Sequence, residues 1–440
     1  MAFQFLIFAA AGLLVTWPSL NYPWFGDDLH LVRVFSAAEL RSVWTATWDV
    51  DGIETAGYRP LTTAFNHARA SVLGEQVAAQ RLLMIVLCAI YLVLIGLIGR
   101  RFRVTPRAML LAGVMMVCAK YSWYHLVWIA DGVHLAQGVL FALAALAILR
   151  WNESESAGWW CASLLCFVLS VLVREDSLAV APVLVGMAVL HSSNQGTSTA
   201  QRKGLIAFSV VIVVVAVAAL LARSAVLPAA SDSPWTAPLD LLAHALSVVT
   251  LAGWEPWILV PLFVLIFALL AAAAFRLEPG GARMACLWLC CAGVSTAPAI
   301  FTSRVNLLFF PVTFYCLFAA DTLSRYAGGE ARLFGRWDRP LAVIVAICCI
   351  AVPAYESRRQ QLSMADGASG RLEASCDIAR GGPWAAATPR NRRDAAVAEL
   401  RRVGLSASAC EELVDAFGAI RSDARFPEGV FVPPQAFLSR

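Results

Sequence analysis

Charged residues are scarce in this sequence. Of its 440 residues, only 15% are Asp, Glu, Lys or Arg, and 60% are hydrophobic. Soluble domains carry about a quarter charged residues, so this excess of apolar residues requires lipid around the chain. The net charge of +4 is too small to indicate a nucleic-acid partner, and we expect none.

Other common signatures are missing too. The chain has neither a glycine-rich nucleotide-binding loop nor an internal repeat. The first apolar segment, Phe3–Leu20, lacks a basic n-region and a small-residue cleavage site. We therefore expect it to be a retained membrane helix rather than a signal peptide.

The chain has twelve cysteines, but few of them lie in polar sequence. In lipid, cysteines are small apolar packing residues, which explains the ten that lie in apolar runs. These ten are Cys88, Cys118, Cys161, Cys166, Cys286, Cys290, Cys291, Cys316, Cys348 and Cys349. Only Cys376 and Cys410 lie in polar sequence, where an oxidising compartment would allow a disulfide and a reducing one would leave both free.

Long apolar runs recur through the first 354 residues, and runs of this length cross a bilayer as helices. They predict an all-α polytopic membrane protein with about eleven transmembrane helices. The expected spans are 3–20, 80–98, 106–120, 132–149, 158–173, 177–190, 205–222, 256–275, 284–300, 305–320 and 339–354.

The basic residues of the loops predict how the chain is inserted, because Lys and Arg concentrate in cytoplasmic loops. The richer set comprises 99–106, the turn at Arg150, 202–203, 276–283 and 321–339. The poorer set comprises 21–79, 120–131, 174–176, 223–255 and 301–304. We expect a multi-pass protein of the bacterial inner membrane with a cytoplasmic N-terminus and a periplasmic C-terminus.

Residues 355–440 differ from the rest in being polar, rich in arginine and punctuated by Gly and Pro. Helical periodicity is present near 392–403 and 407–420. The sequence thus predicts two parts, a transmembrane module at 1–354 with a long outer loop at 21–79, and a small periplasmic domain at 355–440.

Ionisable residues close to a bilayer point to function, and here they cluster on the expected outer side. The first cluster is Asp27 and Asp28, directly after the first span. Adjacent carboxylates push their pKa values apart, so one can act as an ionised base while the other hydrogen-bonds or helps to hold a cation. The alternative is a helix N-cap followed by a first-turn acid.

A second cluster follows in the same loop. Asp49 and Asp51 at alternate positions suit either a divalent cation or a solvated turn. Tyr58 and Arg59 come next. The forked guanidinium of Arg59 suits phosphate, although beside acidic residues it equally suits a structural ion pair.

The third cluster comes from short outer loops. It contains His125, Asp131 and His134, then Arg174, Glu175 and Asp176, and finally Arg304. Histidines at helix ends are also explained by packing or capping. The two arginines lie in loops of a few residues at headgroup level, where either an anionic ligand or lipid headgroups would bind them.

Carboxylates and arginines on one face suggest group transfer. A carboxylate would take a proton from an acceptor hydroxyl while arginines stabilise a departing phosphate. The donor would be a lipid-phosphate conjugate, since nucleotide sugars are not expected outside the cytoplasm.

In chain order, five motifs carry a family resemblance. They are Asp27-Asp28, the run from Tyr58 to Thr63, Trp128-Ile129 with Asp131, Arg174-Glu175-Asp176, and Arg304 through Pro311. Together they resemble the GT-C superfamily of membrane glycosyltransferases, which use polyprenyl-phosphate-linked sugars. The nearest pattern is that of bacterial relatives of the transmembrane tetratricopeptide-repeat O-mannosyltransferases, and it covers residues 1–320.

The resemblance implies a GT-C-like fold and sugar transfer on the periplasmic face, with inversion of the anomeric centre. Asp27 would be the catalytic base and Asp28 its support, while Arg59, Arg174 and Arg304 would bind the lipid phosphate. Tyr58, His125, Asp131, His134 and Glu175 are further site candidates. The partners would be the lipid-linked donor, membrane lipids and a glycan, lipid or protein acceptor.

The sequence leaves open whether the protein uses a divalent cation, Mg²⁺ or Mn²⁺, as a cofactor. Asp27, Asp28, Asp49, Asp51 and Glu175 are available as ligands, yet some relatives work without a metal. The alternative functions are a glycan-lipid transporter or flippase, and a polysaccharide polymerase. A transporter needs polar residues near the midplane and at both mouths, whereas the middles of these spans are almost free of charge.

Overall fold

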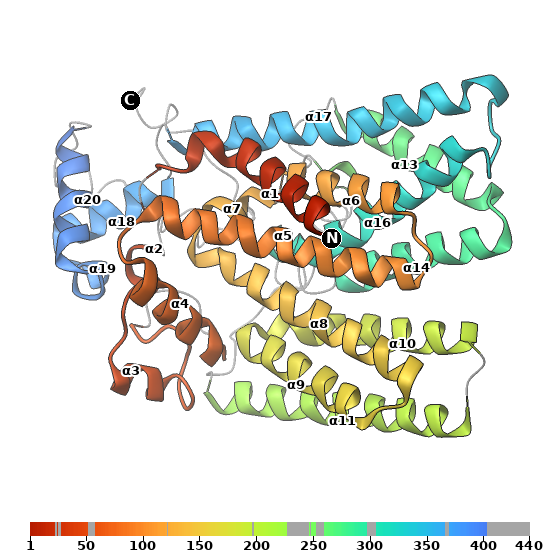
Figure 1. Ribbon diagram of the computed structural model, residues 1–440. Coiled ribbons are helices and arrows are strands. Elements are labelled where there is room, and N and C mark those ends of the chain that lie inside the picture. Colours follow the sequence, from red (N-terminus) through yellow and green to blue (C-terminus); the bar gives the residue numbers. More distant parts are fainter. Residues whose placement is uncertain are drawn as a thin grey trace.

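A computed structural model gives the fold, and every element in the part it describes is a helix. The described residues are 1–22, 24, 28–51, 58–120, 122–195, 198–226, 246, 248–251, 259–296, 305–365 and 369–402. Figure 1 shows long, roughly parallel helices with a cap of short helices at one end.

The helices of the bundle are mostly long and follow one another in chain order, with short 3-10 turns at some of the connections. They are α1 (Ala2–Thr16), α5 (Val77–Arg101), α6 (Pro106–Cys118), α7 (Ser122–Val127), α8 (Val133–Ser154), α9 (Ala157–Val173), α10 (Ala181–Gln195), α11 (Thr199–Val226), α13 (Leu259–Arg276), α14 (Pro279–Ser295), α16 (Phe309–Gly328) and α17 (Asp338–Ala365). The short turns are η1 (Trp17–Ser19), η2 (Ala130–Gly132), η3 (Glu175–Val180), η4 (Val305–Leu308) and η5 (Gly335–Trp337).

The expected apolar segments coincide with helices wherever they are described. Each of the eleven overlaps one of the helices above, while residues 256–258 and 297–300 lie outside the described residues. Six helical stretches of the described residues are long and apolar enough to cross a membrane, namely Ala2–Ser19, Val77–Arg101, Ala130–Ser154, Glu175–Ser193, Thr199–Ala225 and Gly335–Arg359. Three shorter apolar helices are Pro106–Cys118, Ala157–Val173 and Val260–Arg276. An all-α membrane protein is confirmed, while the count of eleven spans and the orientation stay predictions.

Helix α16 is the buried centre of the bundle. Every residue from Phe309 to Leu323 is buried, and the helix packs against α6, α14 and α17. A helix that is apolar on all sides belongs inside a protein or a membrane. Helix α11 shows the opposite arrangement, since it exposes large aliphatic residues such as Val210, Val213 and Leu221, as a lipid-facing helix does.

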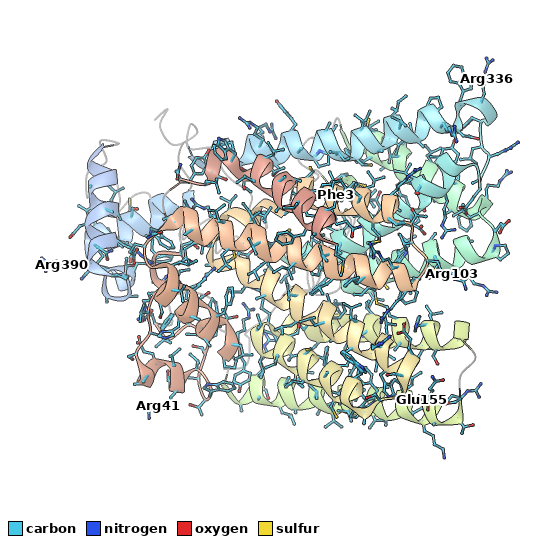
Figure 2. All side chains as sticks on the ribbon, viewed as in Figure 1. Phe3, Arg41, Arg103, Glu155, Arg336 and Arg390 are labelled. Carbon is cyan, nitrogen blue, oxygen red and sulfur yellow. The ribbon has the colours of Figure 1, made fainter. Side chains whose placement is uncertain are left out.

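The two ends of the bundle differ. The outer loop folds into α2 (Asp28–Leu31), α3 (Ala37–Ser42) and α4 (Pro60–Leu73), and these lie at the same end as α18 (Ser369–Arg380), α19 (Pro383–Ala387) and α20 (Arg390–Arg402). Figure 2 places Arg41 and Arg390 at this end and Arg103, Glu155 and Arg336 at the other. Loops expected on the same side of the membrane are therefore grouped together. Which end faces the cytoplasm stays a prediction.

Helix α17 continues beyond the expected end of the last span. We expected that span to end at 354, and the helix runs to Ala365 with Pro353 inside it, so the boundary between the two predicted parts stays a prediction. A proline inside a membrane helix is tolerated because neighbouring groups satisfy the freed carbonyl. The predicted helix near 392–403 is present as α20, whereas 407–420 lies outside the described residues.

The cysteines divide as the sequence suggested. Cys376 in α18 is disulfide-bonded, whereas the ten cysteines of the apolar runs are free thiols. Cys410 lies outside the described residues. A disulfide in the C-terminal part agrees with an oxidising compartment on that side.

Arg392 of α20 fastens the C-terminal helices to the outer loop. Its guanidinium donates to the carbonyls of Asp28 (2.9 Å), Leu29 (3.0 Å) and Val32 (2.7 Å). It also forms a two-point ion pair with Glu75 and lies 4.0 Å from the ring centroid of Trp24.

Apolar contacts surround this buried guanidinium. Leu29 packs against Ile378 and Ala396, and the Trp384 ring meets His30 edge-on at 4.7 Å. The C-terminal helices and the outer loop thus form one cap.

Removing the guanidinium should detach this cap. Arg392→Ala leaves three buried carbonyls without a donor, at a cost of about 1–3 kcal/mol each. We expect trypsin to cleave residues 369–402 much faster in Arg392→Ala than in the wild type. The matched control is Arg390→Ala, since Arg390 is exposed on the same helix. Equal cleavage of both variants would contradict the docking role.

Candidate functional site

Asp28 connects the outer loop to the segment that carries the third polar cluster. Its buried carboxylate accepts the backbone N–H groups of Ala130 (Oδ1) and Ile129 (Oδ2, 3.4 Å). These amides begin η2, so Asp28 acts as a cap supplied from a distant part of the chain. The next residue is Asp131, whose position is therefore fixed by Asp28.

Two buried arginines reinforce the same junction. Arg69 donates to the Ile129 carbonyl at 2.6 Å. Arg81 donates to the carbonyls of Val127 (2.9 Å) and Ser19 (2.8 Å). Burial lowers the pKa of Arg69 to about 9, with Asp28 opposing the shift and Arg392 adding to it. The carboxylate of Asp28 thus also offsets buried positive charge.

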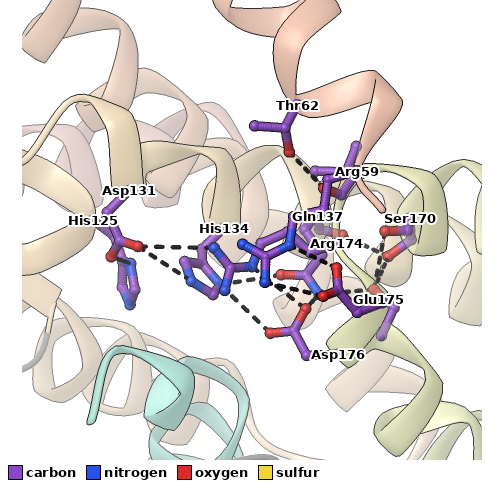
Figure 3. A network of polar contacts seen from close by, with 12 residues as sticks. Arg59, Thr62, His125, Asp131, His134, Gln137, Ser170, Arg174, Glu175 and Asp176 are labelled. Carbon is purple, nitrogen blue, oxygen red and sulfur yellow. Dashed lines mark hydrogen bonds and ion pairs between the residues drawn. The ribbon is translucent and has the colours of Figure 1, made fainter. Parts of the chain in front are cut away.

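Next to this junction, two histidines face one carboxylate. His125 Nδ1 lies 2.9 Å from Asp131 Oδ2, and His134 Nε2 lies 3.4 Å from Asp131 Oδ1. Both rings are 1% exposed, and their centroids are 4.7 Å apart. The Phe309 ring of α16 packs edge-on against His125 at 5.0 Å. Figure 3 shows the cluster between α7 and the start of α8.

A chain of hydrogen bonds leads from His134 to the start of η3. His134 Nδ1 lies 3.1 Å from Gln137 Oε1. Gln137 Nε2 donates to Asp176 Oδ1 (2.7 Å) and to Ser177 Oγ (2.8 Å). The hydroxyls of Ser177 and Ser170 are 2.7 Å apart. This chain fixes the orientation of the His134 ring, as Figure 3 shows.

Arg174 lies between the carboxylates. Its Nε is 3.5 Å from Asp176 Oδ1, and its Nη1 is 4.0 Å from Asp131 Oδ1. The residue is 5% exposed, and Nε has no hydrogen-bond partner among the described residues. These contacts are long for a buried guanidinium, since charge-assisted hydrogen bonds are about 2.7–2.9 Å.

Arg59 is paired more closely. Its Nε donates to Glu175 Oε2 at 2.6 Å and its Nη2 to Oε1 at 3.1 Å, which is the bidentate geometry that arginine prefers. The sequence left a structural ion pair open for this residue, and the structure contains one. Its guanidinium also lies 5.5 Å from the ring centroid of Trp48.

The pKa values separate the two arginines. Burial lowers the pKa of Arg59, but Glu175, followed by Asp176 and Asp131, raises it above its ordinary value. Burial also lowers the pKa of Arg174, and Arg59 lowers it further, so that Asp176 and Asp131 do not restore it. Arg59 therefore has a carboxylate at hydrogen-bond distance, whereas the carboxylates nearest Arg174 lie 3.5 and 4.0 Å from its nitrogens.

The other predicted site residues have different surroundings. Tyr58 donates to the Trp44 carbonyl at 3.3 Å. The Asp51 carboxylate accepts two contacts from Arg33 Nη2, at 3.1 and 3.3 Å, and its backbone N–H donates to Asp49 Oδ1 at 3.1 Å. This geometry is that of a turn, but not the solvated turn that the sequence left open, because Asp49 is only 2% exposed. Asp27 and Arg304 lie outside the described residues, so their roles stay predictions.

Sequence reasoning missed Gln137 and Ser177. Both lie in apolar helical stretches, where a polar side chain is expensive without a partner. Gln137 follows His134 by three residues and therefore lies on the same helix face. That spacing was a usable signal. The buried arginines Arg69, Arg81 and Arg392 had no such signal, because their partners are backbone carbonyls distant in sequence.

Two groups of described residues bring together three side chains able to bind a metal ion. One is His125, Asp131 and His134, and the other is His30, Asp49 and Asp51. Asp28 belongs to neither group. The Glu175 carboxylate forms a two-point ion pair with Arg59.

No protein-family model matches the chain, and no curated protein matches it.

Asp28 should prove structural. Asp28→Ala leaves two buried amides without an acceptor and removes the negative charge near Arg69 and Arg81, and losing such a buried partner costs about 3–5 kcal/mol. We expect the apparent melting midpoint in detergent to fall most for Asp28→Ala and less for Asp28→Asn, which keeps an acceptor oxygen.

The control is Asp51→Ala, since Asp51 is an exposed carboxylate of the same loop. Its midpoint should stay near that of the wild type. A midpoint for Asp28→Ala equal to that of Asp51→Ala would show that the backbone contacts of Asp28 do not stabilise the fold.

Proposed function

We propose that this protein is a glycosyltransferase that moves a sugar from a polyprenyl-phosphate donor to an acceptor hydroxyl at the outer face of the inner membrane, with inversion. One observation carries the proposal. A buried guanidinium, Arg174, lies between two carboxylates that do not fully compensate it. It lies in a short loop between two helices, at the end of the bundle that carries the cap.

Such a group suits a phosphate. An anion beside Arg174 would gain charge-assisted hydrogen bonds, and these strengthen as the leaving phosphate develops charge. Arg59 already has Glu175 as a two-point partner. In this proposal Arg174 binds the donor phosphate directly, and Arg59 holds Glu175 and the adjoining turn in place.

The chemistry also requires a base. Asp27 keeps this role in the proposal, since the carboxylate of its neighbour Asp28 is engaged with backbone amides. The acceptor hydroxyl would lose its proton to Asp27 while its oxygen attacks the anomeric carbon. The bond from that carbon to the phosphate oxygen would break, and the lipid phosphate would leave beside Arg174.

The distribution of polar groups favours an enzyme over a transporter. The polar network described above lies at the capped end, and the centre of the bundle is filled by the apolar helix α16. A transporter binds its cargo near the midplane between repeats.

The first test is release of polyprenyl phosphate. Purified protein is incubated with a panel of polyprenyl-phosphate sugars, and free polyprenyl phosphate is measured by mass spectrometry. We expect release with one donor and loss of release in Asp27→Asn. No release with any donor, together with movement of these lipids across vesicle membranes, would favour the transporter.

A second test concerns Arg174. Arg174→Gln should lower kcat/KM for the donor about 100- to 1,000-fold, as loss of one group that stabilises the transition state does. Arg174→Lys should keep part of the activity, because it retains the charge but not the fork. Arg41→Gln, on the exposed face of α3, is the control. Full activity of Arg174→Gln would show that the donor phosphate does not bind at Arg174.

A further inference from the structure

The hydrogen-bond chain at Gln137 determines which nitrogen of His134 carries a proton. Gln137 Nε2 must face Asp176 Oδ1, because an ionised carboxylate only accepts hydrogen bonds. Gln137 Oε1 then faces His134 Nδ1 at 3.1 Å. An amide oxygen also only accepts, so Nδ1 is the donor.

This assignment puts two acceptors face to face. When Nδ1 carries the only proton, His134 Nε2 presents a lone pair to Asp131 Oδ1 at 3.4 Å. His134 Nε2 makes no hydrogen bond among the described residues, and neither does His125 Nε2. Both histidines are 1% exposed. A buried lone pair opposite a carboxylate is unfavourable unless a positive charge lies between the two.

We propose that His125, Asp131 and His134 bind a divalent transition-metal ion, Zn²⁺. A tetrahedral Zn²⁺ with bonds of about 2.1 Å has edges of about 3.4 Å between its ligand atoms. The distance from His134 Nε2 to Asp131 Oδ1 matches such an edge. The three ligand atoms lie within 4.8 Å of one another.

The surroundings are those of a metal ligand. A histidine that binds a metal donates its other N–H to an oxygen acceptor, which fixes the ring. Gln137 does this for His134, and Asp176 and Ser177 in turn hold Gln137. Asp131 is held by its own neighbours, because Asp28 caps the preceding residue.

The donor set selects the metal. Two imidazoles and one carboxylate favour zinc and its neighbours in the first transition row, whereas Mg²⁺ and Ca²⁺ prefer oxygen ligands. The sequence left open whether Mg²⁺ or Mn²⁺ binds to carboxylates such as Asp49 and Glu175. Three protein ligands leave a fourth position open for water or an anionic oxygen.

The second candidate group is less suitable. His30 Nε2 is 3.7 Å from Asp49 Oδ1, but the Asp51 carboxylate is occupied by Arg33, which also binds Glu39 at 2.8 Å. A metal there would have to displace a guanidinium. We therefore assign the ion to the His125 group.

The test measures metal content without any sugar donor, so its result does not depend on the proposed function. Full-length protein without a histidine tag is stripped with a chelator, equilibrated with Zn²⁺, and analysed by inductively coupled plasma mass spectrometry. We expect one Zn²⁺ per chain, and no displacement by millimolar Mg²⁺. Failure of the wild type to retain Zn²⁺ would overturn the proposal.

Variants locate the ion. Affinity for Zn²⁺ should be lost in His134→Gln and fall about 10- to 100-fold in Gln137→Leu, which removes the group that orients the ring. His191→Gln, a buried histidine beside Glu153, is the matched control and should bind normally. Unchanged binding by His134→Gln would place the metal elsewhere and overturn the assignment.

A third variant excludes loss of folding as the cause. His125→Cys exchanges one zinc ligand for another and should still bind one ion. Co²⁺ bound to this variant should add a sulfur-to-metal absorption band that is absent from the wild type. A His125→Cys protein that binds Co²⁺ without this band would contradict the role of residue 125 as a ligand.

Discussion

The contact between the Asp28 carboxylate and the amides of Ile129 and Ala130 organises the capped end of this protein. It joins a loop after the first helix to a turn a hundred residues later. Both amides would otherwise be buried at the beginning of η2 without partners, which is costly. Asp131 follows directly, so the geometry of the histidine cluster depends on this junction.

Buried arginines also satisfy backbone groups of segments that are distant in the sequence. Arg81 and Arg392 each donate to several backbone carbonyls where segments end or turn. Their charges are held by distant partners, Asp28 for Arg81 and Glu75 for Arg392. In a low-dielectric setting such contacts are strong only when every donor is satisfied. The result is one cap in which the outer loop and the C-terminal helices support each other.

Much of the fold was predictable because lipid imposes a simple rule. Long apolar runs must be helical, and each expected run overlaps a helix among the described residues. The end of α17 was not predictable, since Pro353 and the polar residues after it read as a boundary, yet the helix continues to Ala365.

The sequence predicted which residues of the candidate site lie together better than it predicted the role of each residue. Grouping His125, Asp131, His134 and Arg174 from one expected face anticipated a real cluster. The sequence did not separate Arg59 from Arg174, because only the position of Glu175 in space decides which arginine is compensated. It also left Asp28 between a first-turn acid and a support for the base, and the amides of Ile129 and Ala130 that it binds are visible only in three dimensions.

The proposed function depends on where the donor phosphate binds. The most direct measurement is a cryo-electron microscopy map of the protein in a lipid nanodisc with a polyprenyl-phosphonate sugar that cannot react. We expect the phosphonate against the Arg174 guanidinium at the capped end, with the lipid chain extending toward the membrane. A headgroup bound halfway along the bundle, or at the end that carries Arg103 and Arg336, would contradict it.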